Sequence, residues 1–128
     1  MAAVQHIGFN CKDTKRTEQF YTLHFGFKRA RVFNRDQPNE FVMLRLGNVC
    51  IEFFKSDKDA EGGEQPVGFK HLAFEVDNIE AKIHELKADG CNMGDIIDCS
   101  HISPNMKACF FKDPDGNIIE LMENWADE

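Results

Sequence analysis

Apolar and polar positions alternate along residues 4–11, as in a strand that buries one face. The alternation places His6 on one face of this strand, together with Gly8 and Asn10. Asp13 is a favoured helix N-cap residue and precedes a helical stretch. The elements expected in this half of the chain are a helix over 14–25 and strands over 27–34, 41–46 and 49–54.

The same order of elements is expected again after a polar, glycine-rich segment over residues 56–66. Asp77 and Glu80 have the spacing of a capping box, and Gly90 ends the helix that follows them. The turn-forming segment 113–117 precedes the last strand. The strands expected in this half cover 68–76, 92–99, 106–112 and 118–123, so each half is predicted to be β-α-β-β-β.

The two halves also repeat the same chemical groups. His6 opens the first strand of one half and His71 opens the first strand of the other. Glu52 and Glu120 lie in apolar strands that close the halves, at nearly equal separations from their histidines. Equivalent residues of the two halves are therefore expected to occupy equivalent places.

Two histidines and two carboxylates favour a divalent metal site. A carboxylate within an apolar strand carries a desolvation penalty unless it is paired, hydrogen-bonded or bound to a metal. Taken singly, a strand histidine is more often a hydrogen-bonded core residue, and a strand glutamate more often faces solvent. The pairing across a repeat favours the metal, and an N2O2 ligand set suits Zn²⁺, Ni²⁺, Co²⁺, Fe²⁺ or Mn²⁺.

Composition limits the remaining classes of function. The chain has 128 residues and a net charge of −7, which argues against a nucleic-acid backbone as partner but does not exclude a small-molecule substrate, even an anionic one. No apolar run is long enough to span a membrane. The cysteine count of five is odd and includes no C-x-x-C pair, so reduced thiols and a cytoplasmic location are expected.

The roles of the remaining histidines and of Lys107 are less specific. His24 and His84 are expected on helix surfaces, while His101 lies in a loop over 100–105 that is either a lid or simple decoration. Lys107, at the start of a strand, would either meet an anionic substrate group or remain a solvated charge.

Three motifs resemble the vicinal oxygen chelate superfamily, which includes glyoxalase I, methylmalonyl-CoA epimerase and the bleomycin resistance proteins. They are the His-Ile-Gly-Phe opening at His6, the segment 70–76 around His71, and Asp-Pro-Asp-Gly-Asn followed by Glu120. The resemblance implies an α+β fold of two tandem βαβββ modules, with curled mixed sheets around a metal-binding cup. The chain would be a single domain with modules at about 1–55 and 68–125, a polar linker between them, and a homodimeric assembly.

Within that superfamily, the resemblance implies that His6, Glu52, His71 and Glu120 are the metal ligands. Methylmalonyl-CoA epimerases usually carry glutamine in place of Glu52, so this glutamate is closest to glyoxalase I, the lactoylglutathione lyase. That enzyme detoxifies methylglyoxal through a metal-stabilised enediolate of its glutathione hemithioacetal. By resemblance Glu120 is the catalytic base, and Glu52 acts on the opposite face of the substrate.

The sequence also departs from glyoxalase I. Asn10 stands where an arginine commonly helps to hold glutathione, and no arginine cluster replaces it in the second half. Arg29, Arg31, Arg35 and Arg45 are the available substitutes. The alternatives are an acyl-CoA epimerase and a non-catalytic protein that sequesters a small molecule. A further open alternative is whether the site forms within one chain or across a dimer.

Overall fold

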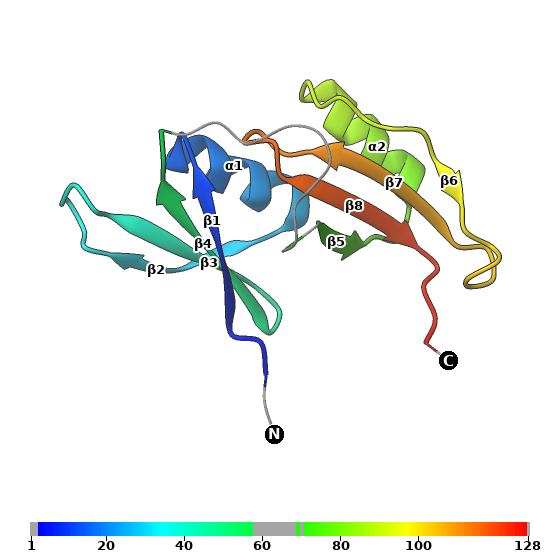
Figure 1. The fold of residues 1–128 in the computed structure, drawn as a ribbon, viewed down its shortest axis with the longest axis horizontal. Coiled ribbons are helices and arrows are strands. Elements are labelled where there is room, and N and C mark those ends of the chain that lie inside the picture. The colour runs from blue at the N-terminus through cyan, green and yellow to red at the C-terminus, as the bar shows by residue number, and fades with distance from the viewer. Residues whose placement is uncertain (1–2, 58–68, 70, 128) are drawn as a thin grey trace. The chain divides into compact units, whose positions relative to one another are not determined.

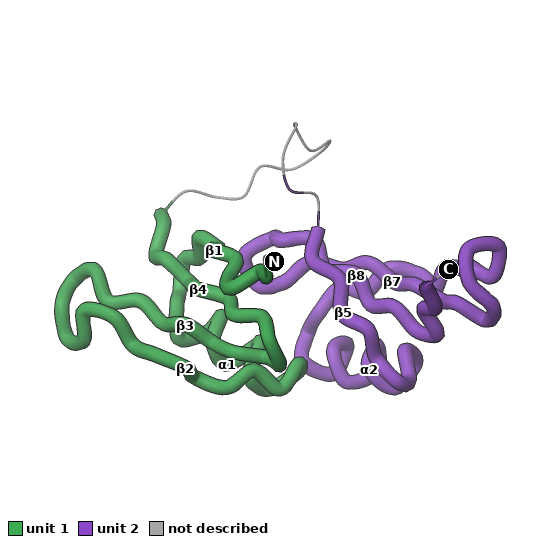
Figure 2. Tube along the Cα trace, turned by 90° about the horizontal axis from the view of Figure 1, so that it is seen from below, with its two compact units in different colours: residues 1–59 green, residues 60–128 purple. Residues whose placement is uncertain are grey.

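The computed structural model describes residues 3–57, 69 and 71–127. The chain divides into two compact units, Met1–Asp59 and Ala60–Glu128, coloured separately in Figure 2. Residues 58–66 of the expected linker, and residues 68 and 70 of the expected strand 68–76, lie outside the described residues. Across the described residues, no helix has the length and apolar character needed to cross a membrane.

The first unit contains one helix and one four-stranded sheet (Figure 1). The strands lie in the order β1-β4-β3-β2, with β1 parallel to β4 and the other neighbours antiparallel. All the elements expected from the sequence are present: β1 (His6–Cys11), α1 (Thr14–Phe25), β2 (Lys28–Phe33), β3 (Phe41–Leu46) and β4 (Val49–Lys55).

Helix α1 begins and ends as its sequence predicts. The Asp13 side chain accepts hydrogen bonds from the amides of Lys15 and Arg16, and Gly26 ends the helix with a φ of 76°. Tyr21 is completely buried and stacks on Phe53 of β4, with 5.4 Å between the ring centroids. This contact shows which face of the sheet α1 covers.

The second unit repeats the architecture in the order β5-β8-β7-β6, with β5 parallel to β8. Its helix lies along β7 and β8 in Figure 1 and buries Ile79, Ile83 and Leu86. The elements are β5 (Leu72–Glu75), α2 (Ile79–Ala88), β6 (Ile97–Asp98), β7 (Lys107–Lys112) and β8 (Ile118–Glu123). The expected fold class, α+β with mixed sheets, is confirmed.

The expected start of the helix in the second unit is corrected. The N-cap of α2 is Asn78, whose side chain accepts from the Ala81 amide, and not Asp77. Glu123 of β8 accepts a hydrogen bond from the Ile79 amide and so satisfies another free donor of the first turn.

The expected strand 92–99 is much shorter, with only Ile97–Asp98 in β6 and one isolated bridge at Met93. The Gly94 amide donates to the Phe110 carbonyl, and a Cβ on Gly94 would lie 2.7 Å from that oxygen. The backbone therefore passes too close to β7 for a side chain.

Of the helical histidines, His84 is exposed as expected, but His24 is not a surface residue. Only 4% of His24 is accessible, and its ring packs against Phe20. An imidazole carries enough apolar surface to pack in this way when its polar atoms are satisfied.

The turn over 113–117 positions the last strand. The Asp113 carboxylate accepts from the amides of Asp115 and Asn117 and from the Asn117 side chain, each at 2.9 Å. Gly116 takes a φ of 87°, in the region that favours glycine. The turn predicted from composition is confirmed, and it leads directly into the strand that carries Glu120.

Candidate metal centre

The first histidine–glutamate pair lies across the parallel strands β1 and β4. Gly8 is the register partner of Glu52, and His6 lies two residues before Gly8, so all three share one face of the sheet. The His6 Nε2 atom is 3.4 Å from Glu52 Oε2. Glu52 is only 8% exposed. Because Phe53 points to α1, this pair lies on the face of the sheet away from the helix.

The second pair has the same construction across β5 and β8. Ala73 is the register partner of Glu120, and His71 lies two residues before Ala73. The His71 Nε2 atom is 3.0 Å from Glu120 Oε2. Glu123 accepts a hydrogen bond from the first turn of α2, so its side chain lies on the α2 face of the sheet. Glu120 is three residues earlier on the same strand, so it lies on the opposite face, away from that helix.

The two pairs therefore share one local design. Each glutamate pairs in register with a small residue, Gly8 or Ala73, and the histidine lies one step earlier on the same face. Gly8 places no side chain beside the carboxylate, and Ala73 places only a methyl group there. The sequence predicts that the histidine and the glutamate occupy equivalent places in the two halves, and the strand register of each unit agrees with this.

The His6 ring also has a partner that the sequence pattern did not reveal. Its Nδ1 atom is 2.6 Å from Gln5 Oε1. In the tautomer that donates from Nδ1, the Nε2 lone pair points toward the Glu52 carboxylate, and two such electron-rich groups repel unless a cation lies between them. A hydrogen bond at the other ring nitrogen is the usual way in which a metal-binding histidine is oriented.

The donor types of both pairs fit a divalent metal ion of the zinc, nickel or manganese kind. In the part of the chain that the structure describes, however, no group of three or more His, Cys, Asp or Glu side chains converges to hold a metal. The structure thus brings together His6 with Glu52, and His71 with Glu120. The four-ligand set remains a prediction.

Lys107 is not on the face that carries Glu120. It is the register partner of Glu123, and its Nζ atom bonds Glu80 of α2 at 3.2 Å. The Glu80 hydrogen bond is the main reason that the Lys107 pKa is raised. Lys107 therefore does not contact a substrate on the face that carries Glu120.

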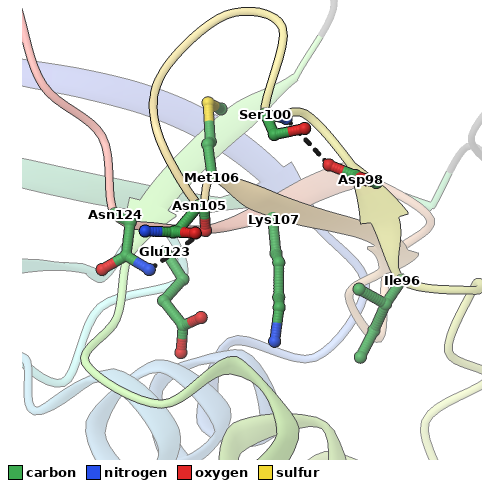
Figure 3. Close-up of a pocket in the computed structure, with 8 residues that line it drawn as sticks. All are labelled: Ile96, Asp98, Ser100, Asn105, Met106, Lys107, Glu123 and Asn124. Carbon is green, nitrogen blue, oxygen red and sulfur yellow. Dashed lines mark hydrogen bonds between the residues drawn. The ribbon is translucent and has the colours of Figure 1, made fainter.

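Lys107 instead lines a pocket of about 490 Å³ in the second unit, shown in Figure 3. Lys107 and Glu123 extend to the same side of the sheet there, toward α2. The remaining lining residues belong to the end of the unit near β6: Ile96, Asp98, Ser100, Asn105, Met106 and Asn124. The pocket is thus separated by the sheet from the face of Glu120.

The loop that contains His101 is held at both ends. Cys99 and Met106 pack with Ala108, and Ser103 Oγ donates to the Asn124 carbonyl. His101 itself is exposed. A lid function for this loop remains a prediction.

The cysteines show no sign of catalytic activation. Cys11, Cys50 and Cys109 are buried in strands, where a thiol packs as a small apolar group. Burial raises the pKa of the Cys109 thiol, which disfavours the nucleophilic thiolate.

Comparison with known proteins identifies the family. Residues 3–121 match the family model of the Glyoxalase/Bleomycin resistance protein/Dioxygenase superfamily. The chain belongs to this superfamily. The family resemblance expected from the sequence motifs, which is the vicinal oxygen chelate superfamily under its other name, is therefore confirmed.

Proteins similar to this chain include YaeR of Escherichia coli (strain K12), which is 30% identical over 94% of this chain and 95% of that protein. The structure of a glyoxalase family protein from Enterococcus faecalis is 30% identical in sequence and has a TM-score of 0.79. The match covers 94% of this chain and 97% of that chain.

A structure of lower sequence identity with the same fold is a mutant fosfomycin resistance protein, FosX, from Listeria monocytogenes, complexed with Mn(II) and 1S,2S-dihydroxypropylphosphonic acid. It is 17% identical in sequence and has a TM-score of 0.80. The match covers 98% of this chain and 94% of the FosX chain. At this identity the likeness establishes the shared fold.

Proposed function

We propose that this superfamily member is a metal-dependent lyase or isomerase of the glyoxalase I type. His6 and Glu52 from one unit, with His71 and Glu120 from the other, would together hold one divalent ion. The observation that carries the proposal is the identical register of the two pairs: each histidine lies two residues before the register partner of its glutamate. Packing alone does not require this coincidence in two separate sheets.

The ion would supply Lewis acidity to two vicinal oxygens of the substrate, which makes the carbon-bound hydrogen between them more acidic. Glu120 would take that proton from the hydroxyl-bearing carbon and return it to the neighbouring carbonyl carbon. His71 lies beside this carboxylate at 3.0 Å and holds its orientation. Glu52, with less than a tenth of its surface exposed, would act from the opposite face of the substrate.

The proposed substrate is a thiohemiacetal or a related α-hydroxycarbonyl compound, with glutathione as a candidate co-substrate. The complex of FosX with Mn(II) and a vicinal diol supports the proposal, because a protein of the same fold there accommodates both a divalent metal and adjacent oxygens. The proposal includes a homodimer, and the four ligands would meet either within one chain or between two.

The test is an assay of hemithioacetal isomerisation on protein stripped with a chelator, with Ni²⁺, Zn²⁺, Co²⁺ and Mn²⁺ added back separately. We expect no activity in the stripped protein and recovery with at least one metal. If metal restores no turnover with glutathione or any other thiol, the lyase proposal fails. A protein that then still binds an α-hydroxycarbonyl compound without metal would be of the sequestering kind.

A further inference from the structure

A β-bulge in β2 turns two neighbouring arginines to opposite faces of the first sheet. Arg29 pairs in register with Leu44 of β3, but Arg31 pairs with Met43, because the register shifts by one residue between them. Without the shift, two residues spaced two apart would share a face. The bulge therefore moves Arg31 away from the α1 side.

The partners of the two arginines agree with this assignment. Arg29 Nε donates to Glu18 of α1 at 2.9 Å, and Leu44 is completely buried on that same side. The Glu18 hydrogen bond also raises the Arg29 pKa. Arg31 has no carboxylate partner among the described residues, and its guanidinium carbon lies 5.1 Å from the centre of the Phe33 ring.

Arg31 lies in line with the histidine–glutamate pair. The register runs across four strands from Gly8 to Glu52, Met43 and Arg31, so these residues share one face. With neighbouring strands about 4.8 Å apart, the backbones of Glu52 and Arg31 are separated by roughly 10 Å. Met43 lies between them on this face, so a small molecule that covers Met43 can contact both the guanidinium and the carboxylate.

The next row on the same face is aromatic. Phe33 and Phe41 are register partners whose ring centroids lie 4.5 Å apart, and the centroid of the Phe41 ring lies 4.6 Å from that of Phe54. The Phe54 ring reaches back over Gly8, since a Cβ on Gly8 would lie 3.4 Å from it. Phe54 keeps 37% of its surface exposed. An apolar wall therefore adjoins both the acidic pair and Arg31.

We propose that Arg31 and the aromatic row of Phe33, Phe41 and Phe54 form the subsite for the non-reacting part of the substrate. Arg31 takes a carboxylate, because a guanidinium matches a planar carboxylate and a single arginine neutralises one charge. The rings take a planar apolar group by stacking. The substrate class is thus a small aryl-bearing carboxylate with vicinal oxygens. The vicinal oxygens and the place of the reacting carbons rest on the proposed function, whereas the carboxylate and the aryl group do not.

The test uses three probes that share the vicinal oxygens. Mandelate has both the phenyl group and the carboxylate, lactate lacks the ring, and mandelamide lacks the charge. Calorimetric titration of metal-free protein, in which no metal contact with the vicinal oxygens contributes, is expected to show mandelate binding about tenfold more tightly than either of the others, the equivalent of one charge-assisted contact or one stacked ring.

Variants assign the two contributions. Arg31→Gln should weaken mandelate about tenfold and leave mandelamide unchanged. Arg29→Gln is the matched control, because Arg29 lies on the same strand but its guanidinium faces α1. The affinity of this variant for mandelate should equal that of the wild type. Phe33→Leu should bring mandelate toward the affinity of lactate.

Equal affinities for mandelate and lactate, or equal effects of Arg31→Gln and Arg29→Gln, would overturn the subsite. So would a change in oligomeric state on gel filtration of Arg31→Gln or Phe33→Leu, since a second copy of the chain would then cover this face. Isomerisation of hemithioacetals without any aryl preference would overturn the subsite alone. Arg31-dependent mandelate binding without isomerisation under any metal would support the subsite and reject the proposed function.

Discussion

Glu120→Gln is expected to lower the turnover of a hemithioacetal substrate by about a thousandfold, in the middle of the range for loss of a general base. The amide has nearly the same shape as the carboxylate but accepts a proton far less readily, and it is also a poorer metal ligand. Its neighbours Ile119 and Leu121 point into the core on the other face, so the fold should be retained. Steady-state kinetics, metal content and circular dichroism of the variant together check this expectation.

The matched control is Glu123→Gln on the same strand. Glu123 lies on the α2 face, where it accepts a hydrogen bond from the Ile79 amide, and a glutamine oxygen can accept the same bond. This variant should keep wild-type turnover. Full activity in Glu120→Gln, or equal losses in both variants, would remove Glu120 from the proposed chemistry.

Tyr21→Ala is expected to lower the free energy of unfolding of the first unit by about 3–5 kcal/mol, the usual cost of deleting a buried aromatic side chain. Tyr21 is completely buried. Its ring stacks on Phe53 and meets Phe27 edge to face, so its removal opens a cavity between α1 and the sheet. Urea unfolding, followed by circular dichroism, measures the change.

Leu23→Ala on the same helix provides the control. Leu23 is 64% exposed, and substitutions at such positions usually change stability by no more than about 0.5 kcal/mol. A Tyr21→Ala variant as stable as Leu23→Ala would contradict the packing of α1 on this sheet.

The sequence predicts the two pairs because both members of each pair lie within one half of the repeat. Strand alternation places His6 and Gly8 on one face, and a parallel neighbour in register then brings Glu52 to the same face. His71 and Glu120 follow the same rule. Helix α1 is equally predictable, since Asp13 and Gly26 supply standard signals at its two ends.

Features that depend on a single added residue or on a distant contact are not predictable in this way. The bulge between Arg29 and Arg31 reverses the face that simple alternation assigns to Arg31. Asn78 replaces Asp77 as the cap where Glu123, from the last strand, bonds the Ile79 amide. Patterns within one half likewise specify one sheet, whereas a four-ligand site depends on how two sheets associate.

The central claim, that two pairs share one ion, is tested most directly by calorimetric titration of chelator-treated protein with Ni²⁺. We expect one ion per chain in the wild type, and a loss of that single site in both His6→Ala and His71→Ala. Two ions per chain, with each variant losing only one, would show that each pair binds its own metal. That result, or the absence of any binding, would contradict the account.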